Sequence, residues 1–292
     1  MAEANKMTSL KTAAKNMLTQ LKNAASQNGD VYVSIIPFAE DVNVDPVNYG
    51  QTWVRWDLWD EVNGTCSNSS HKTKSNCASN GKTWTAKNHN TWDGCVTDRD
   101  QNYDTTNTAP STGQVATLFP AEQYGITFSG TFFDLCPVPL MGLSYDWTKL
   151  NTKIDSMQPT AYTNQAIGLQ WGFQSLTSAP FTIPSKDSNY KYQEVIVLFT
   201  DGLNTSDRWY PYGGSTSQAS IDARQKITCD NIKAAGITIY AVQVTTDADP
   251  KSTLLENCAT NSSNFFFLTS ASEIITIFNQ IGTNLSQLRI AK

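Results

Sequence analysis

The feature that most constrains the fold is a repeated alternation of apolar runs and helical patterns in the C-terminal half. The unbroken run VIVLFT ends at Thr200, and ITIYAVQV and NFFFLT follow it as the next two candidate strands. Helical spacing of apolar residues separates these runs, over about 218–235 and 250–258, and continues over 271–288. Strands that alternate with helices predict an α/β fold: a doubly wound, mostly parallel sheet with helices on both faces.

The same alternation begins at the N-terminus and is then interrupted. Apolar residues at helical spacing predict an amphipathic helix over 6–26, and VYVSIIPF over 31–38 predicts a mostly buried strand. From about Glu40 to Tyr145 the chain becomes polar and carries tryptophans and cysteines, and helical patterns resume over 146–157 and 164–176. A structureless loop of that length is improbable in a compact domain. We therefore expect a discontinuous α/β domain over 1–44 and 146–292, with an insertion over 45–145.

Six cysteines indicate a disulfide framework. Their number is even and none stands in a CxxC pair, which favours three disulfides over a zinc site or a redox motif. Disulfides indicate an oxidising compartment outside the cytoplasm. Chain proximity favours two pairs inside the insertion, and two successive helices carry the third; spacing alone does not determine connectivity. The favoured pairs are Cys66 with Cys77, Cys95 with Cys136, and Cys229 with Cys258.

Composition excludes one class of partner and leaves the route of export open. Only 16% of the residues are charged, the formal net charge is -5, and no cluster of Lys and Arg occurs. Nucleic-acid binding depends on neutralising phosphates, so we expect no nucleic-acid partner. The first residues have no apolar core of signal-peptide type, and no run is long enough to span a bilayer. We expect an exported chain whose signal or anchor lies outside this sequence.

Asp201 and Thr163 are the candidate site residues. Asp201 ends the run VIVLFT and precedes Gly202. Ligands of open parallel sheets bind at the carboxyl ends of strands, although an Asp-Gly pair is more often a simple turn. Thr163 stands just before a helical pattern, where it could cap the helix or turn its hydroxyl toward the same crevice. Local sequence does not decide between these alternatives.

An acidic run in the insertion resembles the start of a calcium-binding loop. Asp98, Asp100, Asn102 and Asp104 stand at alternate positions in DRDQNYD. Tyr103 occupies the position that needs glycine, and no acid follows at the twelfth position. We therefore expect a solvated loop here.

Tryptophans are dense in the insertion, which favours a small aromatic core packed around the disulfides. The alternative is an exposed recognition surface for a glycan or a protein. The residues concerned are Trp53, Trp56, Trp59, Trp84 and Trp92.

Taken together, several segments resemble a known family. LFTDG at a strand end, TNQAIGLQWGFQSL before it and ITIYAVQV after it are similar to a von Willebrand factor A domain. VSIIPFAEDVNV, WDGCVTDRDQ and the ending FNQIGTNLSQLRIAK resemble the TadG-like proteins of bacterial tight-adherence pilus systems. The resemblance extends over nearly the whole chain, and WDGCVTDRDQ is its most family-specific part.

The resemblance implies a metal-ion-dependent adhesion site. In the family, Mg²⁺ or another divalent ion is held by an Asp-x-Ser-x-Ser run after the first strand, a threonine from a second loop and an aspartate from a third. An open coordination position then captures a carboxylate of a protein partner. Thr163 matches the threonine and Asp201 the aspartate.

The Asp-x-Ser-x-Ser run is absent from this chain. Met1 corresponds to the methionine that precedes the family's first helix, so we expect the run and the first central strand upstream of Met1. We expect the sheet of this chain to lack that strand, and the chain alone to bind metal poorly.

The resulting hypothesis is a non-enzymatic binding or assembly protein of a tight-adherence pilus or surface-adhesion system in the bacterial cell envelope. It would contact a membrane only through a segment outside this chain. One alternative is an envelope metal-dependent hydrolase that uses Asp201, although no set of histidines or carboxylates that would activate water accompanies it. Another is a structural envelope module with a vestigial metal site.

Overall fold

The three C-terminal strands form one parallel sheet, as the sequence predicts. A computed structural model describes residues 1, 5–122, 125–128, 131–134, 136–160, 162–212, 214, 216–245 and 249–287, with the backbone alone for 125–128 and 131–134. The strand order is β11-β12-β13, with Val195 opposite Thr238 and Ala241 opposite Phe265. The strands are β11 (Val195–Thr200), β12 (Thr238–Val244) and β13 (Phe265–Leu268).

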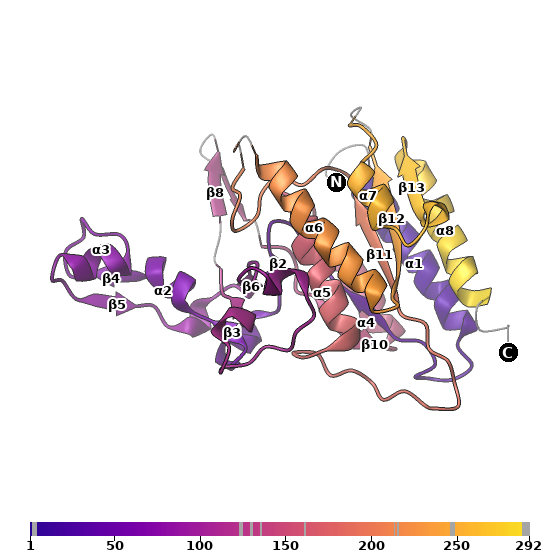
Figure 1. Ribbon diagram of the computed structural model, residues 1–292, viewed down its shortest axis with the longest axis horizontal. Helices are drawn as coiled ribbons and strands as arrows, with labels where there is room; N and C mark the ends of the chain where they lie inside the picture. The colour runs from indigo at the N-terminus through magenta and orange to yellow at the C-terminus, as the bar shows by residue number, and fades with distance from the viewer. Residues whose placement is uncertain are drawn as a thin grey trace.

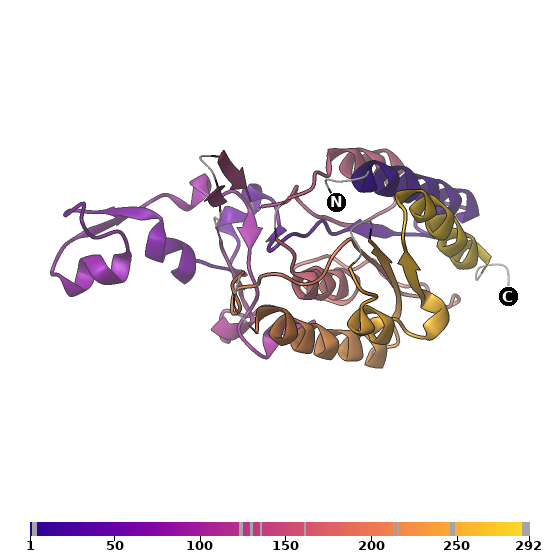
Figure 2. The ribbon, with the colours of Figure 1, turned by 90° about the horizontal axis from the view of Figure 1, so that it is seen from above.

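Helices cover both faces of this sheet (Figure 2), so the predicted α/β fold is confirmed. Successive side chains of β12 point to opposite faces. Tyr240 and Val242 pack against α1 and α8, whereas Ile239 and Ala241 pack against α5, α6 and α7. The helices are α1 (Lys6–Ala24), α8 (Ala271–Gln287), α5 (Gln165–Thr177), α6 (Ser217–Ala234) and α7 (Thr253–Cys258).

A second, two-stranded sheet stands apart from the first. Strand β1 (Val33–Ile35) pairs antiparallel with β10 (Met141–Ser144). Helix α4 (Trp147–Ser156) packs beside them and buries Leu150 against Leu18 of α1. Sequence analysis assigned residues 141–144 to the insertion, but this pairing attaches β10 to the α/β part. Its four residues are too short for a strand pattern to be recognised in the sequence.

The described part of the insertion contains short paired strands, two α-helices of six residues each and four short 3-10 helices. Figure 1 shows β4, β5 and α3 projecting away from the α/β part. Two antiparallel pairs are β4 (Gly64–Cys66) with β5 (Trp84–Ala86) and β8 (Gly125–Phe128) with β9 (Thr131–Asp134). A third joins β6 (Cys95–Val96) of the insertion to β2 (Val42–Asn43), which lies just before it in the chain. Strand β3 (Val54–Arg55) pairs in parallel with β7 (Phe119–Pro120), and the helices are α2 (Asp57–Val62) and α3 (Lys74–Ser79).

The core of the insertion continues into the α/β part. Trp59 and Trp92 are 1% and 2% exposed and belong to the same apolar cluster as Ile167 and Trp171 of α5. Trp56 makes edge contacts with both Trp59 and Trp92. The packing interpretation of the tryptophans is thus confirmed for Trp59 and Trp92.

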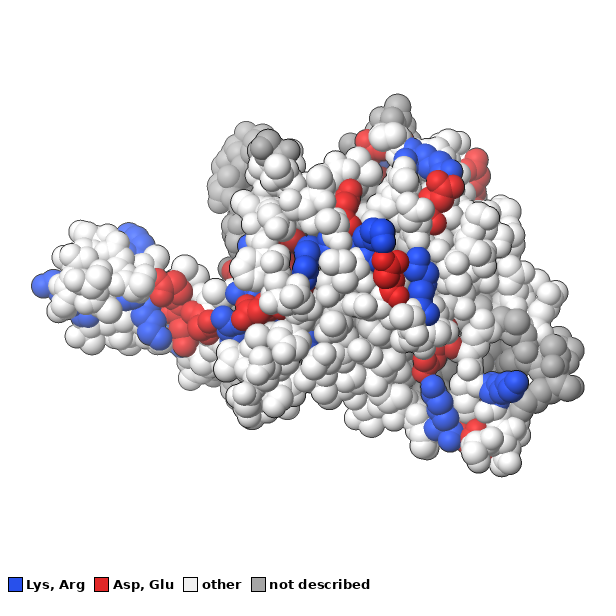
Figure 3. All heavy atoms as spheres, viewed as in Figure 1, with Lys and Arg blue, Asp and Glu red and all other residues white. Residues whose placement is uncertain are grey.

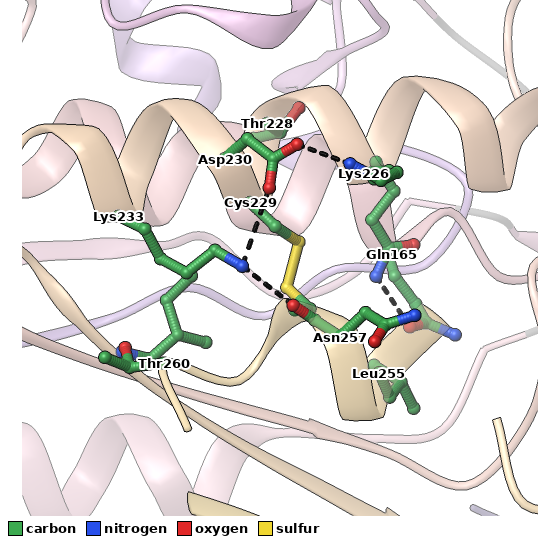
Figure 4. The surroundings of a disulfide bond; sticks show 12 residues. Gln165, Lys226, Thr228, Cys229, Asp230, Lys233, Leu255, Asn257 and Thr260 are labelled. Atoms are coloured by element: carbon green, nitrogen blue, oxygen red, sulfur yellow. Dashed lines mark hydrogen bonds and ion pairs between the residues drawn. A yellow bond between two sulfur atoms is a disulfide. The ribbon is translucent and has the colours of Figure 1, made fainter. Parts of the chain in front are cut away.

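Three disulfides join the pairs that the sequence favoured. Cys66 is bonded to Cys77, Cys95 to Cys136, and Cys229 to Cys258. Figure 4 shows the third bridge linking α6 to α7, with Lys233 reaching across to the carbonyl oxygen of Asn257 at 2.7 Å. The bridge and this hydrogen bond hold α7 against α6 beneath the parallel sheet.

Candidate functional site

Asp201 lies directly after β11, where the chain bends away from the sheet. Its side chain is 18% exposed. The carboxylate contacts two ammonium groups: the N-terminal amine of Met1, and the Nζ atom of Lys6 at 3.6 Å. Gln165 of α5 donates from Nε2 to the carbonyl oxygen of Gly202 at 3.0 Å and so holds the bend. Within the sequence, the cationic side chain beside Asp201 is therefore that of Lys6.

Thr163 lies in the loop before α5, and the helix cap is the next residue. Asn164 accepts a hydrogen bond from the Ile167 amide at 3.2 Å, which is the capping contact. The Thr163 amide donates to Oγ1 of Thr205 at 2.7 Å, and the Thr163 carbonyl oxygen accepts from the Thr205 amide at 2.8 Å. The loop that carries Thr163 is therefore tied to the loop that follows Asp201.

Thr163 and Asp201 line one cavity of about 1540 Å³. Its lining runs along β11 and reaches Thr200 and Asp201 at the carboxyl end of the strand, the edge at which ligands of parallel sheets bind. The structure thus places both predicted site residues in the same crevice. Their role as metal ligands stays a prediction.

The side chains of Asp201 and Thr163 carry oxygen donors of the types found in metal shells. A carboxylate and a hydroxyl are hard oxygen donors of the kind that Mg²⁺ takes, but Mg²⁺ requires six ligands in an octahedral array. In the part of the chain that the structure describes, three possible ligand side chains approach one another only at Asp93, Cys95 and Cys136. There the two sulfur atoms are bonded to each other. Asp201 and Thr163 fit a divalent ion as two ligands of an incomplete set.

Asp98 is buried next to Asn164, although its sequence context predicts an exposed residue. Asp98 was expected in a solvated loop, yet it is 6% exposed. Its Oδ2 accepts hydrogen bonds from Nδ2 of Asn164 at 2.9 Å and from the amide of Arg208 at 3.4 Å. Burial, and then the nearby Asp207 carboxylate, raise the pKa of Asp98 to about 8. At neutral pH this carboxyl group is largely protonated.

Two more acids lie close to Asp98. Burial raises the pKa of Asp41 well above its ordinary value, and the carboxylates of Glu122, Glu40 and Asp98 raise it further. Burial also raises the pKa of Glu40, although Oγ of Ser206 donates to its Oε1 at 2.8 Å. Glu40 and Asp41 stand in EDVNV, and Asp98 stands in WDGCVTDRDQ. The resemblance of these segments to a known family is the sequence signal that could have singled the acids out.

The other acids of the expected loop join the insertion to the α/β part. Arg208 contacts Asp100 at 2.9 Å, and Arg224 of α6 pairs with Asp104, which is 7% exposed. Figure 3 shows acidic and basic side chains side by side where the insertion meets α6. The solvated-loop expectation is wrong for Asp98 and Asp104 because their partners, Asn164, Arg208 and Arg224, are distant in sequence.

Comparison with known proteins gives a family match and distant structural likenesses. A family model of the von Willebrand factor type A domain matches residues 124–280, more than half of the chain. No curated protein sequence gives a significant match. The chain is similar to the pilus adhesin SpaC from Lactobacillus rhamnosus GG, with a TM-score of 0.49 and 12% identity, over 97% of this chain and 28% of that one.

It is also similar to proximal thread matrix protein 1 from the mussel byssus, with a TM-score of 0.35 and 18% identity, over 57% of this chain and 35% of that one. A structure of that mussel protein with a zinc-occupied MIDAS motif is 17% identical, with a TM-score of 0.35 and the same coverage. Likeness at this level says nothing of ligand or partner. Among the described residues, no helix is long and apolar enough to cross a membrane.

Proposed function

Because the chain belongs to the von Willebrand factor type A domain family, we propose that it is a non-enzymatic binding module with an adhesion-type role at the bacterial cell envelope. Its three disulfides support a location outside the cytoplasm. The resemblance of VSIIPFAEDVNV and WDGCVTDRDQ to TadG-like proteins supports a place in a tight-adherence pilus system. The partner is a protein rather than a nucleic acid, given the net charge of -5.

The observation that supports the proposal is that Asp201 and Thr163 both line the cavity that runs along β11. The hydrogen bonds between Thr163 and Thr205 fix the two loops relative to each other, so the site is preorganised. Asp201 presents a carboxylate that lies 3.6 Å from the ammonium of Lys6. A carboxylate at this edge favours a cation beside it.

Asp201 and Thr163 would be the protein's ligands to a divalent cation at this edge. A bound cation of this kind offers an open coordination position to a carboxylate of the partner. Asp201 supplies the negative charge and Thr163 a neutral oxygen. The Lys6 ammonium, 3.6 Å from the Asp201 carboxylate, opposes a second cation there. We therefore propose that this chain binds the metal weakly.

We propose no catalytic role for Asp201. The two histidines of the sequence are His71 and His89, and both lie in the insertion. His89 stacks on Trp56 and contacts Asp60 at 2.9 Å, away from the cavity. Among the described residues that line the cavity there is no histidine, and its acids other than Asp201 are Asp30, Asp187 and Glu194.

Calorimetric titration of the full chain with Mg²⁺, and separately with Zn²⁺, tests the site. We expect weak, saturable binding that Asp201→Asn abolishes and that Thr163→Val reduces several-fold. The matched control is Asp155→Asn, which alters an exposed acid paired with Lys15 and should leave binding unchanged. Equal binding by the wild type and Asp201→Asn would show that the ion is held elsewhere and would overturn the metal proposal.

A further inference from the structure

Residues 64–88 form an arm that projects from the rest of the molecule (Figure 1). The arm contains β4, α3 and β5, and Cys77 is its one buried residue. It therefore has no apolar core of its own and adds little to the core of the insertion. A projecting segment that contributes so little to the core is expected to act through its surface.

The arm is held in one shape although most of it is exposed. The disulfide between Cys66 and Cys77 closes its outer turn, and β4 pairs with β5. Trp84 lies so close to Gly64 that a Cβ atom there would be 2.5 Å from the indole ring. The Lys82 amide donates to the carbonyl oxygen of Cys77 at 3.0 Å. The side chains of the arm are thus displayed in a fixed arrangement, which lowers the entropic cost of binding.

The charged side chains of the arm are all basic. Its lysines are exposed, and no Asp or Glu occurs over 62–92. Elsewhere lysines pair with acids, as Lys251 does with Glu256 at 2.7 Å, whereas no arm lysine forms an ion pair with a described residue. On the face that Figure 3 shows, basic side chains are spread over the arm, and acidic ones begin where it joins the rest of the insertion. The arm lysines are Lys72, Lys74, Lys82 and Lys87.

This charge is opposite in sign to that of the remaining chain. The sequence has 21 Lys and Arg, of which four are in the arm, against 26 Asp and Glu. The other residues therefore carry 17 basic against 26 acidic side chains, a difference of -9. An anionic partner is repelled by most of the molecule and attracted by the arm, so it is directed to the arm.

Large apolar side chains are nearly absent from the arm. Trp84 is its one aromatic residue, and 64–88 contains no Val, Ile, Leu, Met, Phe or Tyr. Most of its other residues are Asn, Ser and Thr, which donate and accept hydrogen bonds. Protein interfaces depend on aromatic and arginine anchors and are depleted in Lys and Ser. The surface of the arm therefore fits a hydroxyl-rich anionic chain better than it fits a protein.

We propose that the arm binds an acidic polysaccharide. Carboxylates of the polymer lie beside the four lysines, and its hydroxyl groups exchange hydrogen bonds with the Asn, Ser and Thr side chains. Each contact is exposed and weak, so affinity arises because several lysines engage one polymer chain at the same time. This surface is separate from the Asp201 edge, and binding there needs no metal ion.

Two other anionic partners fit the arm less well. A surface of anionic lipids would attract the lysines, but the arm has no exposed large apolar side chain to enter the bilayer interface beside them. Duplex DNA would also attract lysines, but the arm contains no arginine, the residue that most often reads base edges. Both partners serve as competing probes in the test.

Binding of the full chain to immobilised polygalacturonate, in EDTA, tests the proposal, and neutral dextran is the reference polymer. We expect saturable binding to polygalacturonate and none to dextran. The affinity should fall several-fold between about 0.01 M and about 0.15 M salt, because the Debye length shrinks from about 30 Å to about 8 Å. Hydrogen exchange should slow at the amides of β4 and β5 and stay unchanged at β12. Equal binding to dextran, or binding without slower exchange in the arm, would overturn the proposal.

Two quadruple variants separate the arm from general charge. Replacing the four arm lysines with glutamine should weaken polygalacturonate binding about tenfold or more, since each exposed ion pair adds only a small amount. The control replaces four other exposed lysines with glutamine and changes the net charge equally, so it should leave most of the affinity. Its changes are Lys149→Gln, Lys186→Gln, Lys226→Gln and Lys251→Gln, at side chains that are 76%, 52%, 61% and 48% exposed.

The remaining outcomes also decide the matter. Equal losses in the two quadruple variants would overturn the proposal, because the polymer would then respond to net charge alone. Tighter binding to phosphatidylglycerol vesicles or to duplex DNA than to polygalacturonate would assign the arm to that partner instead. Asp201→Asn should retain polymer binding, which distinguishes a failure of the arm from a failure of the metal site.

Discussion

Replacing Asp98 with asparagine removes a carboxyl group that the fold keeps from ionising. Asp98 is 6% exposed and lies at the junction between the insertion and α5. Burial, with a smaller contribution from Asp207, raises its pKa from 3.8 to about 8. Each pH unit between these values corresponds to about 1.4 kcal/mol, so ionising Asp98 costs the folded state on the order of 5 kcal/mol relative to the unfolded chain.

The sign of the pH dependence follows from proton binding. Between about pH 4 and pH 8 the folded state holds a proton on Asp98 that the unfolded state has released. The stability that Asp98 contributes is therefore complete below about pH 4, declines as the pH rises and is lost above about pH 8. Asp98→Asn keeps the shape and one acceptor oxygen for Asn164. We expect it to match the wild type near pH 4 and to be several kcal/mol more stable near pH 8.

Urea unfolding followed by tryptophan fluorescence at pH 5, 7 and 9 measures this effect. The free energy of unfolding should fall less steeply with pH in Asp98→Asn than in the wild type. Asp155→Asn, at a surface acid that is 57% exposed, is the control and should leave the slope unchanged. Parallel slopes for wild type and Asp98→Asn would refute the reasoning, since they would mean that Asp98 is ionised in the folded protein.

Three further predictions concern the bridge, the cation at Asp201 and the junction. Replacing Cys229 and Cys258 with alanine removes a disulfide between residues 29 positions apart. The free energy of unfolding, measured with urea, should fall by about 4 kcal/mol. An unchanged value would mean that the bridge adds nothing to stability. Lys6→Gln removes the ammonium group that lies 3.6 Å from the Asp201 carboxylate. The affinity for Mg²⁺, measured by calorimetry, should rise several-fold. An unchanged affinity would argue against a metal ion at Asp201. Arg224→Leu removes the ion-pair partner of buried Asp104 and should lower the free energy of unfolding by roughly 2–3 kcal/mol. The double variant Arg224→Leu/Asp104→Asn should regain part of that free energy. If the losses of the two single variants simply add in the double variant, the pairing contributes nothing to stability.

The sequence predicted the α/β part well because its elements are long and periodic. The helix expected over 6–26 is observed as Lys6–Ala24, and the strand expected over 194–200 as Val195–Thr200. In such segments many residues contribute to one periodic signal. The strands of the insertion have two to four residues, as β3 and β9 illustrate, and so give no period to recognise. For the same reason β10 was assigned to the insertion.

The acids of DRDQNYD show where local reasoning about charge fails. A run with three acids and one basic residue is expected in water, because unpaired charge is costly to bury. Here Asp104 is paired with Arg224, 120 positions away, and Asp98 is buried in its protonated form. Neither compensation can be recognised from the residues adjacent to the run. The placement of Thr163 and Asp201 was predictable, by contrast, because both lie at ends of periodic elements.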